Sequence, residues 1–211
     1  MMFPKEFKEA LSHLPSIEKD KLILQLLKKD LVLANRLLFE LVNTDTVEEQ
    51  REKVEKTILF RLRRSADMGH SSISYLNWDV RELSGYINEH VSITKDKFGE
   101  GYLNLILTIN VLEINKDYIL NSRPPAKRRK FSVAIIARVF KILLIINKLD
   151  SDFLIEFEEN LIKLGELISE NNYIMEEAIK NGLDINWLLN AEIPDNITAI
   201  YKEIRVNGFL R

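Results

Sequence analysis

The residues of this chain best suited to chemistry are basic and lie close together. The sequence RPPAKRRK supplies a short basic run: Arg123, Lys127, Arg128, Arg129 and Lys130. In the helix expected after it, about 100° per residue places Lys130, Arg138 and Lys141 on one side. A positive stripe of this kind predicts a surface for phosphates, whether of nucleic acid, nucleotides or lipid headgroups.

An acidic stretch downstream offers a purely structural account of the same charges. Asp152, Glu156 and Glu159 open a helix expected between about residues 151 and 170. Two antiparallel helices of opposite charge would form ion pairs that cancel the field, although exposed pairs contribute only about 0–1 kcal/mol each. No aromatic residues interleave with the basic run, as they do in most single-strand binders. Ion pairing to residues 151–170 and phosphate binding both remain open.

The spacing of the carboxylate residues allows a second kind of chemistry to be considered, the metal-dependent hydrolysis of nucleotides. All-helical pyrophosphohydrolases place Glu-x-x-Glu on one helix and Glu-x-x-Asp on another, so that four carboxylates converge on magnesium. Glu49, Glu52 and Glu55 match the first motif. The second motif occurs only at Glu192–Asp195, where Pro194 would break the helix. We therefore expect no metal site and no catalytic residue, and a divalent-metal hydrolase is the third alternative.

Histidine and serine residues give little support for catalysis. His13, His70 and His90 are widely separated, and none lies in a known metal-binding motif. Asp67 and His70 share the polar stretch 65–74 with several serines, but no nucleophile-elbow motif accompanies them. The sequence predicts an ordinary polar loop there and no cofactor.

Three aromatic residues lie on a comparatively polar predicted helix: Tyr75, Trp78 and Tyr86. Aromatic rings of this size usually need burial, so we expect them to cover the N-terminal core. The alternative is an exposed cluster, because Trp and Tyr are enriched where proteins bind partners. In that case these three residues are the candidate partner-binding residues.

Composition narrows the class of protein. With 46% hydrophobic and 29% charged residues the chain is too apolar for disorder, and its 7 Gly and 5 Pro are too few for a turn-rich β fold. The net charge of −2 gives no general attraction to nucleic acid. The absence of cysteine excludes disulfides and thiolate zinc sites. Residues 131–149 are apolar but interrupted by charges, so we expect a buried helix, no membrane span and a cytoplasmic protein.

Helical periodicity recurs along the whole chain. Residues 16–42 read as two short amphipathic helices, Thr46 and Glu49 match a capping box, and Arg123-Pro124-Pro125 breaks the chain. The sequence predicts an all-α fold of about eight to ten helices, as an antiparallel bundle or an irregular stack of helical pairs, with a HEAT-like solenoid as one form. We expect one domain over residues 1–211, with a subdomain break at 121–130.

The function expected from these patterns is a non-catalytic helical module for protein–protein interaction or scaffolding. It rests on the missing catalytic motifs and on an analogy with folds that offer grooves to partners. A protein partner is expected, and a homo-oligomer fits the same patterns. The alternative is a phosphate- or nucleic-acid-binding protein that uses the basic stripe between residues 123 and 141.

Overall fold

The computed structural model describes residues 3–70 and 72–211. Within these residues the chain is 79% helical, has twelve α-helices and contains no strand, which confirms the predicted all-α fold. Ten of the twelve helices have seven or more residues. Among the described residues, no helix combines the length and apolar character needed to span a membrane.

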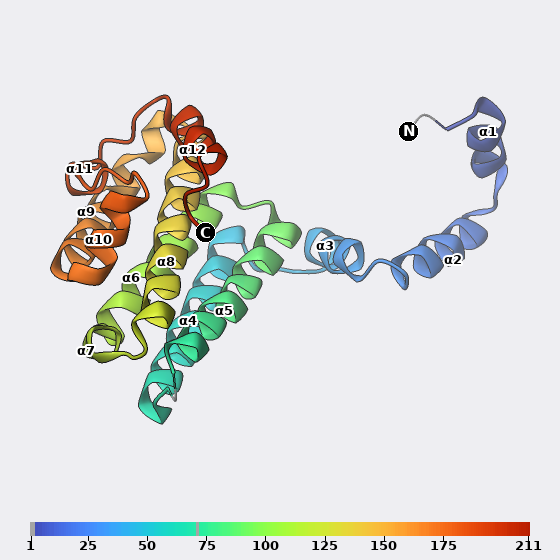
Figure 1. Ribbon diagram of the computed structural model, residues 1–211. Coiled ribbons are helices and arrows are strands. Elements are labelled where there is room, and N and C mark those ends of the chain that lie inside the picture. The colour runs from blue at the N-terminus through green and yellow to red at the C-terminus, as the bar shows by residue number, and fades with distance from the viewer. Residues whose placement is uncertain (1–2, 71) are drawn as a thin grey trace. The chain divides into compact units, whose positions relative to one another are not determined.

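The chain forms two compact units (Figure 1). The first is Met1–Thr44 with Ser92–Thr94, and the second is Asp45–Val91 with Lys95–Arg211. The first unit contains α1 (Lys5–His13), α2 (Ser16–Leu27) and α3 (Leu31–Leu41). Asp30 begins α3, because its carboxylate accepts a hydrogen bond of 3.0 Å from the backbone N–H of Leu33.

The second unit holds the remaining helices. In chain order they are α4 (Val47–Met68), α5 (Ile73–Thr94, whose last three residues fall in the first unit), α6 (Lys97–Ile114), α7 (Lys116–Asn121), α8 (Pro125–Ile146), a 3-10 turn (Ser151–Phe153), α9 (Ile155–Glu170), α10 (Asn172–Lys180), α11 (Asn186–Leu189) and α12 (Ile197–Val206). Residues 121–130, the predicted subdomain break, comprise the last residue of α7, the short connection after it and the first six residues of α8, all within this unit.

Local sequence signals set the starts of two long helices. The capping box at α4 is confirmed: Thr46 accepts from the backbone N–H of Glu49, and the Glu49 carboxylate accepts from that of Thr46. At α8, Pro125 occupies the first turn, where its fixed φ suits the helix and its missing N–H costs nothing. Most of the basic run therefore lies on the first two turns of α8 and not on a loop.

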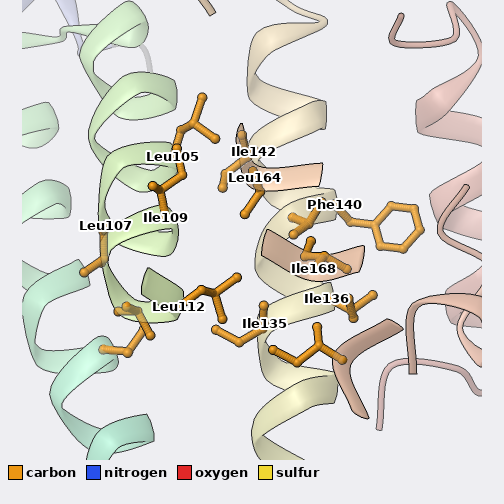
Figure 2. Packing of buried hydrophobic residues seen from close by; sticks show 14 of the residues in the cluster. Leu105, Leu107, Ile109, Leu112, Ile135, Ile136, Phe140, Ile142, Leu164 and Ile168 are labelled. Atoms are coloured by element: carbon orange, nitrogen blue, oxygen red, sulfur yellow. The ribbon is translucent and has the colours of Figure 1, made fainter. Parts of the chain in front are cut away.

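The core of the second unit centres on α6, α8 and α9. Figure 2 shows Leu105 and Ile109 of α6 facing the side chains of α8, with Leu164 and Ile168 of α9 close by. Around this centre, α4 packs on α6, α10 packs on α8 and α9, α11 packs on α9, and α12 packs on α8. The apolar faces of these helices are thus covered by their neighbours in the chain.

A buried carboxylate fixes the start of α6. Asp96 forms a two-pronged ion pair with Arg51 of α4 (2.7 and 3.0 Å), lies 3.0 Å from His90 Nε2 and accepts from the backbone N–H of Gly99 (2.7 Å). A Cβ at Gly99 would lie 2.0 Å from the carboxylate, so glycine is needed there. Burial alone would raise the pKa of Asp96, but the bonds from His90, Arg51 and Gly99 outweigh burial and lower it to about 2.

Because this folded-state pKa lies below the ordinary value of 3.8, Asp96 stabilises the fold above about pH 4, and the stabilisation is lost as the pH falls toward 2. We expect Asp96→Asn to cost about 3 kcal/mol at pH 7, since Arg51 loses its buried carboxylate partner and is left with the exposed Glu48 nearby. Urea unfolding from pH 7 to pH 2 should show the gap between wild type and variant narrowing below pH 4. The exposed Asp152→Asn is the control and should change stability little. A gap that stays constant with pH would contradict this assignment.

A second prediction concerns the apolar core. Phe140 of α8 is fully buried, whereas Phe60 of α4 is 65% exposed. Phe140→Ala should lower the free energy of unfolding by about 3–5 kcal/mol, because it removes buried apolar surface and leaves a cavity. Phe60→Ala makes the same chemical change at the surface and should cost no more than about 0.5 kcal/mol. Equal losses in chemical denaturation would show that the packing in Figure 2 is wrong.

Candidate functional site

The structure divides the predicted basic stripe into residues with different surroundings. Arg123 precedes α8 and Lys127 lies in its first turn, and both are exposed to solvent. Lys130 is also exposed and lines a cavity together with Arg138. The stripe predicted from helical spacing is therefore split between open surface and a cavity.

Arg128 and Arg129 hold neighbouring elements together. Arg128 donates to the backbone carbonyls of Leu120 (3.3 Å) and Ser122 (3.0 Å), and its guanidinium lies 3.3 Å from the centre of the Tyr173 ring. Arg129 Nε lies 3.2 Å from Glu177 Oε1 of α10, and that carboxylate is only 5% exposed. These contacts connect the first turns of α8 to the turn before it and to α10.

The acidic residues 151–170, considered above as ion-pair partners of the basic run, do not pair with it among the described residues. In the described part of the chain, no ion pair joins residues 123–141 to residues 151–170, which lie mainly on α9. Instead, Glu170 binds Lys116 (2.7 Å), and Lys163 of α9 binds Glu113 of α6 (3.0 Å). The field of the basic residues is therefore not cancelled in the predicted way.

Two cations of the stripe lie deeper in the protein. Arg138 donates to Asn104 Oδ1 of α6 (3.0 Å) and to Ser84 Oγ of α5 (2.7 Å), and burial lowers its pKa to about 10. Lys141 lies 3.9 Å from a carboxylate oxygen of Glu100. Burial lowers the pKa of Lys141, with a contribution from Arg138, while Glu100 opposes the shift.

The three predicted aromatic residues also differ from one another in their exposure to solvent. Tyr75 and Trp78 of α5 are 59% and 60% exposed, so the expected burial in the core is wrong for both. They line a shallow cavity of about 300 Å³ with Ser74. Tyr86 is half-buried against the core, and the Arg61 guanidinium lies 4.6 Å from the centre of its ring. That Tyr75 and Trp78 bind a partner stays a prediction.

A cavity of about 380 Å³ lies between α4 and α5 near the polar stretch 65–74. There Ser65 donates to Asp79, and His70 Nδ1 lies 3.6 Å from the same carboxylate. The Ser65 hydroxyl is thus bonded to a carboxylate and not to an imidazole nitrogen that could take its proton. This arrangement is not the relay that an acyl-transfer enzyme needs. Asp67 is exposed at the surface.

The carboxylates considered for magnesium have other partners. Glu49 belongs to the capping box of α4, and Glu52 pairs with Lys56 at 3.3 Å. Within residues 3–70 and 72–211, no group of three or more His, Asp or Glu side chains is placed to hold a metal ion. The hydrolase alternative stays a hypothesis.

The N-terminal helices present a different surface. None of the residues of α1, α2 or α3 is buried. Twelve large apolar side chains of this segment are between 41% and 78% exposed: Phe3, Phe7, Ile17, Ile23, Leu24, Leu26, Leu31, Val32, Leu33, Leu38, Leu41 and Val42. Sequence periodicity indicated apolar faces here, but it did not show that they are left uncovered.

Comparison with known proteins adds no relative from which a role could be transferred. No protein-family model, curated protein or solved structure matches this chain.

Proposed function

We propose that this chain is a non-catalytic interaction module that acts as a scaffold by joining copies of itself through α1, α2 and α3. The observation that carries the proposal is the set of twelve exposed apolar side chains on a segment with no buried residue. Soluble proteins rarely leave so much apolar surface uncovered unless it contacts another molecule.

Helix length strengthens the case for association. The three helices have 9, 12 and 11 residues, and helices this short are marginal in water unless an apolar face is packed. Burying one leucine-sized side chain contributes about 1.5–3 kcal/mol. Contacts to another molecule would therefore supply the stability that the segment does not obtain from a core of its own.

A second copy is the partner that this surface fits best. Residues 3–44 contain seven Lys or Arg and six Asp or Glu, so the segment has almost no net charge that would select an acidic or basic protein. A standard interface covers roughly 800 Å² per partner around an apolar centre, and the twelve exposed apolar side chains can supply such a centre. In a symmetric pair the same helices would contribute from both chains.

The test is the mass of the purified chain by size-exclusion chromatography with light scattering over a series of protein concentrations, because self-association depends on concentration by mass action. The wild type should have at least twice the single-chain mass of 24.6 kDa. Leu38→Glu/Leu41→Glu places two charges on the exposed face of α3 and should give the single-chain mass, since buried unpaired carboxylates oppose association.

The matched control is Gln25→Glu/Asn35→Glu, which adds the same two negative charges at exposed polar positions of α2 and α3. It should keep the wild-type mass. A monomeric wild type would overturn the proposal, and so would equal masses for the two double variants.

A further inference from the structure

The second unit contains a cavity whose charged side chains are all basic. It has a volume of about 480 Å³ and lies between α5, α8 and the C-terminal residues. Four cationic side chains line it, namely Arg81, Lys130, Arg138 and Arg211, and no Asp or Glu side chain is among its lining residues. From this basic lining we infer that the cavity binds a small organic phosphate. Phosphate binding there does not depend on the proposed self-association of α1–α3.

Arg138 is the centre of this site because its charge is held in place without being neutralised. Its two hydrogen bonds go to the neutral oxygens of Asn104 and Ser84. Within the described residues, no carboxylate forms an ion pair with Arg81, Lys130 or Arg138. A partly buried guanidinium without a counter-ion carries a desolvation cost, and a bound anion would offset it. Although burial lowers its pKa to about 10, Arg138 is cationic at neutral pH.

The geometry of the helices brings the other cations to the same cavity. Lys130 and Arg138 are eight residues apart on α8 and so lie on one side of it, about two turns apart. Ala134 and Ala137 lie between them on that side, and their small side chains leave room for a ligand. Arg81 reaches the cavity from α5, where it is one turn away from Ser84, the residue that anchors Arg138.

Phosphate is the anion that this arrangement suits. A guanidinium has five N–H donors in a fork that matches phosphate oxygens, and Arg138 uses two of them on Asn104 and Ser84. The cavity is larger than a free phosphate needs and has apolar walls at Val80, Val133 and Leu210. This combination fits an ester whose organic part packs on those walls.

A small ligand fits better than a nucleic-acid strand. The cations converge on one cavity and do not follow a track along the surface, as they do in strand-binding proteins. Arg128 and Arg129, which would extend such a track along α8, are engaged with Tyr173 and Glu177. We therefore expect a monophosphate to bind and a strand to gain nothing over it.

The experiment is isothermal titration of the full chain with adenosine monophosphate, glycerol 3-phosphate and inorganic phosphate at low salt. Either organic phosphate should bind, and the tighter one identifies a nucleotide or a glycerol-phosphate type of ligand. Arg81→Gln/Lys130→Gln should weaken binding at least tenfold, because two charge-assisted contacts are lost. Arg138 is left unchanged in this test, since its bonds join α5, α6 and α8.

The matched control is Arg123→Gln/Lys127→Gln, which removes one Arg and one Lys from the exposed part of the same basic run. It should change the affinity less than twofold. Equal weakening in the two double variants would overturn the inference, because it would indicate general attraction to positive charge. The inference also fails if neither organic phosphate binds at millimolar concentration, or if a twelve-nucleotide RNA binds and the monophosphates do not.

The monomeric form predicted for Leu38→Glu/Leu41→Glu separates this inference from the proposed function. The cavity lies wholly in the second unit, so that variant should bind the phosphate ester as the wild type does. Loss of phosphate binding with an unchanged oligomeric mass, as expected for Arg81→Gln/Lys130→Gln, would assign the two properties to different surfaces.

Discussion

The arrangement of the second unit depends on α6 and α8, because apolar residues lie on most sides of these two helices and must be shielded from water. Ten residues of α6 and ten of α8 are buried, from Gly99 to Leu112 and from Phe131 to Ile146. Each helix therefore needs neighbours on several sides. The two helices cover each other, α4 and α9 cover more of α6, and α10 and α12 cover more of α8. The positions of the other helices follow from this requirement for apolar contact.

Because α6 and α8 are buried so extensively, the polar side chains between them need hydrogen-bond partners within the protein. Asn104 of α6 is fully buried; its side-chain amide donates to the backbone carbonyl of Glu100, and its backbone carbonyl accepts from Thr108. These bonds leave the Asn104 amide oxygen as an acceptor for Arg138. Because a buried polar group without a partner is costly, Asn104 fixes the guanidinium at one place. The basic cavity is in this way a consequence of the same packing that forms the core.

Much of the fold, but less of the surface, could be predicted from sequence. Apolar periodicity predicted the all-α fold, and the capping box at Thr46 was visible because its signal is local. The exposure of Tyr75 and Trp78 was missed because the buried face of α5 is already filled by smaller residues: Ile73, Leu76, Val80, Leu83 and Ile87. Helical spacing placed Lys130 and Arg138 together, but Arg81 joins them only through tertiary packing.

The two units differ in where their stability originates. The helices α4 to α12 surround a common apolar core, so the second unit has the means to stay folded at any protein concentration. The helices α1 to α3 contain no buried residue, and under the proposed self-association the contacts between chains supply free energy that keeps them helical. Their helicity is then linked by mass action to the concentration of the molecule they bind. On the proposed function, the chain assembles when its concentration rises, while the basic cavity in the second unit stays formed throughout.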